Sequence, residues 1–174
     1  MAQLTRLSAR LAHIHPAVFV AICFGWFFVP SALPAVGFNI LGGLVFLFNF
    51  TYGPLWTHGV YSASELTKGN VARWQMIFIA SEALCLLTAA SFFIAPVPEG
   101  EVIAEVSKYL AYAFVVVQLI AWWIAARAFV SVPRGDESPR WLSNTAAVYW
   151  LIWAAPIGAW VLRPHIRELR RSLR

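Results

Sequence analysis

The chain has 174 residues, of which 60% are hydrophobic and 12% are charged. Soluble domains carry about 25% charged residues, so this composition excludes an ordinary soluble domain and predicts a membrane protein. The formal net charge is +5, but five of the thirteen basic residues lie in the C-terminal segment LRPHIRELRRSLR, next to an apolar run. Membrane topology and anionic headgroups explain basic residues in that position, so the charge does not indicate a nucleic-acid partner.

The first two predicted spans lie in residues 11–61, a stretch without Asp, Glu, Lys or Arg. A helix needs about 20 residues to cross the hydrocarbon layer of a bilayer, so this stretch is long enough for two crossings. Pro30 and Pro34 divide it, because proline disrupts the interior of a helix. We therefore expect spans at about 13–30 and 35–58, joined by a tight uncharged turn.

The polar segment SASELTKGNVAR follows, and Ser62–Glu65 has the spacing of a capping box, so we expect a connection in which a helix begins at Ser62. A third span is expected at about 74–93 and a fourth at about 107–131, separated by the acidic loop APVPEGEVIAEVSK. A fifth is expected at about 143–162, after the charged turn VPRGDESPR. Short loops between apolar helices predict one all-α domain, a polytopic integral membrane helical bundle of five spans, with four spans as the alternative.

Both ends of the chain have amphipathic patterns. Apolar residues recur at spacings of three and four, with arginines on other faces: Leu4, Leu7 and Leu11 near the N-terminus, and Ile166, Leu169 and Leu173 near the C-terminus. Segments of this kind commonly lie along the headgroup region of a membrane. We expect two terminal helices that anchor the bundle.

Glu82 is a carboxylate inside the third predicted span, roughly 12 Å below the nearer surface for a helical rise of 1.5 Å per residue. An isolated charge at the bilayer centre costs about 2.5–3.5 kcal/mol on insertion scales, so Glu82 must face protein or water, be protonated, or pair with a cation. Arg127 is the basic residue at comparable depth, and we expect a Glu82–Arg127 contact. The pair is either a structural link between two spans or a site for a ligand, an ion or a proton.

Other polar side chains extend this hypothesis. The predicted intramembrane polar site comprises Glu82, Arg127, Tyr149, His58 and Gln118. Asn49, Tyr52 and Trp56 share one face of the second span at i, i+3, i+7 spacing. They are candidates for lining a pocket, although an interhelical hydrogen-bonding seam is the favoured interpretation.

Motifs for catalysis or metal binding are lacking in the sequence. His13 and His15 stand two residues apart, which places them on different faces of a helix, and the two cysteines, Cys23 and Cys85, both fall in predicted spans. We therefore expect no metal site. No nucleophilic triad, P-loop or dinucleotide fingerprint occurs either, so the sequence identifies neither a catalytic residue nor a cofactor.

Three classes of function agree with these features. The favoured one is a non-catalytic subunit, assembly or binding component within the bilayer. The second is a small-molecule, ion or proton transporter that uses Glu82 and Arg127, and the third is an integral-membrane enzyme acting on a lipid-soluble substrate, with His58, Glu82 and Tyr149 as acid–base groups. We expect a multi-pass protein of a bacterial-type inner membrane. Its expected partners are membrane lipids, another membrane protein or a second copy of the chain, and a hydrophobic small molecule.

Overall fold

A computed structural model describes residues 2–12, 53–70, 73–94, 100–133 and 138–171. All regular structure in these ranges is helical: α1 (Ala2–Leu11), a helix over 53–67, α4 (Gln75–Ile94), α5 (Gly100–Val130), the short 3-10 helix η2 (Arg140–Ser143), α6 (Thr145–Trp153) and α7 (Ala155–Arg171). The predicted all-α class is thus confirmed for this part of the chain. The predicted span at 13–30, and most of the one at 35–58, lie outside the described residues.

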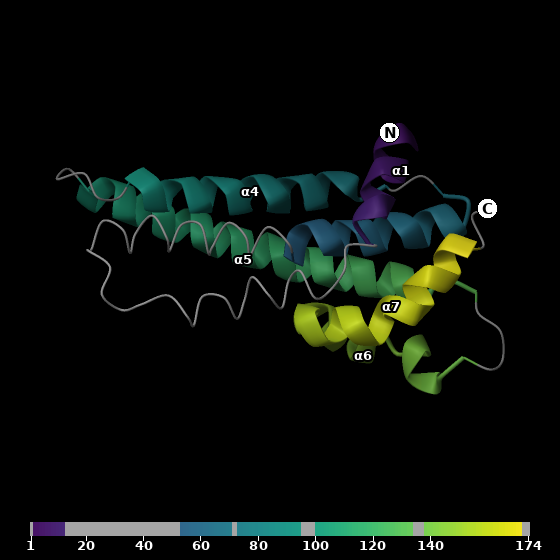
Figure 1. The fold of residues 1–174 in the computed structure, drawn as a ribbon. Coiled ribbons are helices and arrows are strands. Elements are labelled where there is room, and N and C mark those ends of the chain that lie inside the picture. Colours follow the sequence, from purple (N-terminus) through teal and green to yellow (C-terminus); the bar gives the residue numbers. More distant parts are fainter. Residues whose placement is uncertain (1, 13–52, 71–72, 95–99, 134–137, 172–174) are drawn as a thin grey trace, which may run out of the picture.

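The helices form an elongated bundle around the α4–α5 hairpin (Figure 1). α4 and α5 run antiparallel, and the 53–67 helix lies beside them in the same direction as α5 (Figure 1). α1 crosses the bundle near the start of α4, where Gln75 Nε2 and Ser8 Oγ are 3.5 Å apart. α6 packs against α5, and α7 packs against α6.

The 53–67 helix is buried on nearly all sides, since residues 56–64 are all inaccessible to solvent. Trp56 and Val60 belong to the hydrophobic core, but hydroxyl groups are buried beside them. Thr57 donates to the carbonyl of Gly53 at 2.7 Å, and Ser64 donates to that of Val60 at 2.8 Å. These bonds satisfy the two hydroxyl groups within the helix itself, without polar partners from neighbouring helices.

The predicted helix start at Ser62 is wrong, because Ser62–Glu65 lies inside the 53–67 helix. The helix ends at Thr67. Gly69 follows with φ 72°, a left-handed conformation that glycine adopts without steric penalty, and its N–H donates to the Leu66 carbonyl at 2.9 Å. Much of the segment that reads as a polar connection is therefore a core helix, in which Ser64 is satisfied by a carbonyl of the same helix.

α4 and α5 correspond to the third and fourth predicted spans. α4 agrees closely with the predicted 74–93, whereas α5 begins well before the predicted 107, so that part of the acidic loop is helical. Within the described residues, one helical stretch, the 23 residues Lys108–Val130, is long and apolar enough to cross a membrane. Gln75–Ser91 is a shorter apolar stretch.

The predicted fifth span is divided into two helices. α6 ends at Trp153, the chain turns sharply, and α7 begins so close to α6 that a Cβ on Gly158 would lie 1.6 Å from the Leu151 carbonyl oxygen. Pro156 accounts for the break, because it has no N–H to continue the α6 ladder and is accepted in the first turn of a new helix. With 9 residues, α6 is about 14 Å long, which is too short to cross a bilayer alone.

Large apolar side chains cover much of the outside of these helices. On α5 they recur every three or four residues along the exposed side, with one adjacent pair: Tyr109, Tyr112, Val116, Leu119, Ile120 and Trp123. Others are exposed on α4, α6 and α7: Leu86, Leu87, Trp150, Trp153, Ile157 and Trp160. Polar side chains such as His58, Ser81 and Gln118 are buried instead. The described part of the chain is therefore apolar outside and partly polar inside.

Candidate functional site

The centre of the site is a hydrogen-bonded pair between His58, on the 53–67 helix, and Glu82, on α4. His58 Nδ1 lies 2.8 Å from Glu82 Oε1, and the two side chains are 3% and 20% exposed. With Glu82 as a carboxylate, which only accepts hydrogen bonds, the donor of this bond is the Nδ1–H of His58. The carboxylate of Glu82, inside an apolar helix, is thus stabilised by a hydrogen bond from a neighbouring helix. An isolated carboxylate in the bilayer would be unfavourable, so such a partner is expected.

The predicted Glu82–Arg127 contact is not formed. A hydrogen bond from Ser81 to Gln118 sets the register of α4 and α5, and it places Gln118 at the level of Glu82. Arg127 lies nine residues beyond Gln118, about 14 Å along the helix axis, and its side chain is exposed. The sequence prediction estimated the depth of each residue from the ends of its own span, and this placed Glu82 and Arg127 at a similar depth. It had no information on how α4 and α5 are aligned along their axes.

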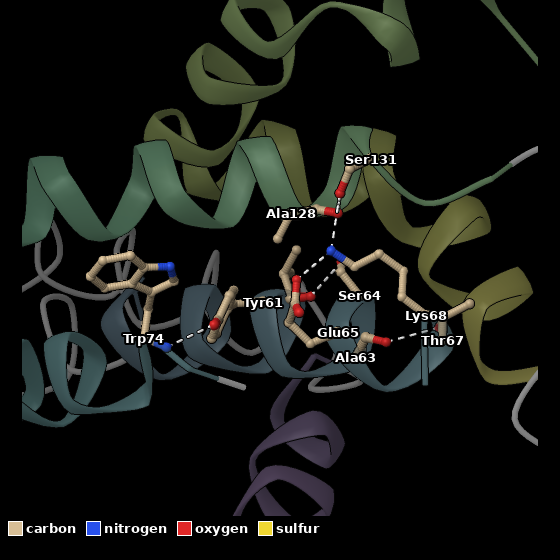
Figure 2. Close-up of polar contacts among 10 residues, drawn as sticks. Tyr61, Ala63, Ser64, Glu65, Thr67, Lys68, Trp74, Ala128 and Ser131 are labelled. Atoms are coloured by element: carbon tan, nitrogen blue, oxygen red, sulfur yellow. Dashed lines mark hydrogen bonds and ion pairs between the residues drawn. The ribbon is translucent and has the colours of Figure 1, made fainter. Parts of the chain in front are cut away.

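Aromatic rings cover one side of the pair. His58 stacks on Phe78 with ring centroids 5.3 Å apart, and Phe78 stacks on Tyr61 at 4.7 Å. The Tyr61 hydroxyl accepts a 2.9 Å hydrogen bond from the Trp74 N–H (Figure 2). Burial raises the pKa of Tyr61 above its usual range, and this hydrogen bond partly opposes the shift. Tyr61 is therefore neutral at physiological pH, and its ring packs on Phe78 beside the pair.

Gln118 and Trp122 extend the site along α5. Gln118 is 3% exposed, and its Oε1 accepts the hydrogen bond from Ser81 Oγ. Trp122 lies one turn further along α5 and meets Tyr149 of α6 edge to face, with centroids 6.4 Å apart. Tyr149 is thus connected to the site through the ring of Trp122.

Four buried polar atoms in the described residues have no hydrogen-bond partner in the structure: His58 Nε2, Ser62 Oγ, Gln118 Nε2 and Trp122 Nε1. Leaving such a group unsatisfied costs about 1–3 kcal/mol, and native proteins keep few of them. All four belong to the 53–67 helix or α5, at the His58–Glu82 level or one helical turn beyond it. Their concentration in one region distinguishes this region from the rest of the core.

A second polar cluster joins the end of the 53–67 helix to the end of α5 (Figure 2). Lys68 pairs with Glu65, and Lys68 Nζ donates to Ser131 Oγ at 3.0 Å. Ser131 Oγ in turn donates to the Ala128 carbonyl at 2.9 Å. Because these groups are used within the cluster, we interpret it as a structural link between the two helices.

The structure brings together part of the predicted site. His58 and Glu82 are in contact, and Gln118 lies at their level through its bond to Ser81. Trp56, a candidate for lining a pocket, is 1% exposed and belongs to the core. Two predicted pocket residues, Asn49 and Tyr52, lie outside the described ranges, as do His13 and His15.

Sequence reasoning missed two members of the site. Ser62 was assigned to a helix start, and Trp122 has no pattern that separates it from the other tryptophans of α5. The signal for Ser62 was its position four residues after His58, which places both on one face of a helix.

In the part of the chain that the structure describes, no three His, Cys, Asp or Glu side chains gather as a metal site would require.

No protein-family model, curated protein or solved structure matches the chain at a significant level. Its function must therefore be inferred from the site and the surface.

Proposed function

We propose that the chain is a polytopic membrane protein that acts as a non-catalytic binding or assembly component within the bilayer. The observation that carries the proposal is the distribution of side chains on the α4–α5 hairpin. Large apolar residues are exposed along α5, while Gln118 and Ser81 are buried between the helices. Extended apolar surfaces mark membrane or protein contacts, and polar groups in membrane helices face the bundle interior.

The hairpin supports more than one crossing. α5 contains a stretch long enough to span a bilayer, and α4 runs antiparallel against it over its whole length (Figure 1). A helix paired along its length with a spanning helix shares its environment, so both cross if one does. The apolar part of α4 is shorter than that of α5, a difference that helix tilt or local thinning of the bilayer accommodates.

A binding role agrees with the enclosed position of the site. The His58 side chain is 3% exposed and stacks on the ring of Phe78, which also stacks on Tyr61. A permeation path needs polar groups that continue to both surfaces, whereas a fixed, enclosed polar cluster suits a bound ligand or partner group. The transporter hypothesis rested on a Glu82–Arg127 contact, which the observed register separates.

The proposal is tested on membranes from cells that express the full chain. After an alkaline carbonate wash, the membranes are solubilised in mild detergent, and the purified protein is examined by native mass spectrometry. We expect the chain to resist the wash and to retain a stoichiometric partner or small molecule. Release by carbonate would contradict the membrane location, and a bare monomer after gentle solubilisation would contradict the binding role.

A membrane enzyme is the second candidate, because a histidine oriented by a carboxylate has the arrangement of a general base. Its Nε2 has no partner among the described residues, so it is free to take a proton from a substrate. If the protein is an enzyme, His58→Gln abolishes turnover of a lipid-soluble substrate while the protein remains folded. A binding component loses affinity in the same variant and shows no turnover in the wild type.

A further inference from the structure

The four unpartnered atoms lie at two adjacent levels of the bundle. His58 and Gln118 share the first level, because their partners Glu82 and Ser81 are neighbours on α4. Ser62 and Trp122 are each four residues further along their helices. The 53–67 helix and α5 run in the same direction (Figure 1), and the bond between Lys68 and Ser131 keeps them in register. One turn of helix therefore carries Ser62 and Trp122 to the same next level.

The hydrogen-bonding capacities of these atoms complement one another. Because Nδ1 of His58 donates to Glu82, the Nε2 of the neutral ring offers a lone pair. The Gln118 amide nitrogen and the Trp122 indole nitrogen can only donate. Ser62 Oγ can do either. One oxygen that carries a hydrogen fits this set, since it donates to an acceptor and accepts from a donor.

The surroundings restrict the ligand to a neutral group. A neutral His58 leaves the negative charge of Glu82 in place, which disfavours an anion, and the N–H donors of Gln118 and Trp122 disfavour a cation. Arg127 is exposed well away from this region. The neighbouring side chains of Phe78, Tyr61 and Trp122 are aromatic, and they suit a ring or a hydrocarbon chain better than an ion. We propose that His58, Ser62, Gln118 and Trp122 form a binding site for a neutral hydroxyl group, supplied by a lipophilic phenol or alcohol, or by water. This inference rests on the proposed binding role in the membrane.

The test uses 2-naphthol and 2-methoxynaphthalene, which share a ring system but differ in the O–H. The full chain in detergent is dialysed against each compound, with empty micelles as the reference. We expect saturable binding of 2-naphthol, with the ether binding about tenfold more weakly, as the loss of one good hydrogen bond implies. Gln118→Leu should weaken the binding of 2-naphthol by a similar factor.

Ser62 and Ser64 provide a matched pair of variants. Both are 0% exposed on the same helix, but Ser64 Oγ donates to the Val60 carbonyl, whereas Ser62 Oγ has no partner in the described structure. Ser62→Ala should weaken 2-naphthol binding, and Ser64→Ala should leave it unchanged. Equal binding of the naphthol and the ether, or equal effects of the two serine variants, would overturn a lipophilic hydroxyl as the ligand.

A second measurement tests whether the hydroxyl group in the site belongs to water and not to a lipophilic compound. In that case 2-naphthol shows no saturable binding, and a nuclear Overhauser effect connects water to an indole N–H signal that Trp122→Phe removes. If neither naphthol binding nor this water contact is found, the site itself is refuted. These outcomes are independent of the carbonate wash, so a failed membrane location and a failed hydroxyl site are told apart.

Discussion

Glu82 is held inside an apolar helix by one neighbour, His58. In Glu82→Ala, the buried Nδ1 of His58 loses its acceptor, and we expect the free energy of unfolding to fall by about 1–3 kcal/mol. Arg127→Ala removes an exposed side chain, and its effect should stay within about 0.5 kcal/mol. Unfolding of both variants in detergent measures the difference. Equal destabilisation by the two changes would support the predicted Glu82–Arg127 contact and contradict the observed pairing of Glu82 with His58.

The sequence predicts some of these residue-scale features and not others. The cost of an isolated charge in lipid requires that Glu82 meet a compensating group, and His58 was among its predicted neighbours. The identity of the partner depends on the register between helices, which the spacing within one helix does not contain. Ser81 and Gln118 set that register through a side-chain hydrogen bond that is visible only after folding.

At the scale of elements, the turn between α6 and α7 depends on Gly158. A Cβ at this position would lie 1.6 Å from the backbone oxygen of Leu151, and backbone cannot move aside as a flexible side chain can. We expect Gly158→Ala to destabilise the protein by about 3 kcal/mol. Gly53, where an added Cβ would meet nothing within 4 Å, serves as the control. Gly53→Ala should cost far less than Gly158→Ala, and similar losses in both variants would contradict the close approach of α6 and α7.

The inner side of α5 packs closely against the core through small residues, and substitution of Ala125 tests this packing. Ala125 is 0% exposed in the core, whereas Ala113 is exposed on the same helix. Ala125→Leu should cost about 1–3 kcal/mol because the packed interior has no room for the added atoms. Ala113→Leu should be neutral. Unfolding midpoints in detergent compare them, and a neutral Ala125→Leu would show that the interior is looser than the structure indicates.

Prolines and hydrophobic runs in the sequence predict some of the helices and helix ends. α4 and α5 follow from their apolar lengths, and the break before α7 follows from Pro156, a signal that the predicted span 143–162 did not use. The predicted span 35–58 includes only the first residues of the 53–67 helix, because the Ser, Thr and Glu residues that follow read as a loop. In the structure, Thr57 and Ser64 satisfy their own hydroxyl groups on backbone carbonyls four residues earlier, which makes a polar sequence suitable for burial.

At the scale of the whole molecule, the central claim is that the apolar outer side of α5 faces lipid. The exposed side chains on that side are large and apolar, and Val116 is 56% exposed. In a soluble bundle the exposed side of a helix is expected to be polar. Hydropathy predicts that the helix is apolar throughout, but it does not predict which side is outward. The buried positions of Phe114 and Gln118 define that side, because they direct Val116 away from the core.

Spin-label accessibility at Val116 tests this claim most directly. The label is attached to a cysteine placed at Val116, in a protein whose Cys23 and Cys85 are alanine, and the protein is reconstituted into liposomes. Asn70, an exposed polar residue at the end of the 53–67 helix, provides the water-facing reference. We expect the label at Val116 to collide with dissolved oxygen far more often than with a water-soluble nickel chelate, and the label at Asn70 to show the reverse. A label at Val116 that meets the chelate as freely as the label at Asn70 would contradict a lipid-facing α5.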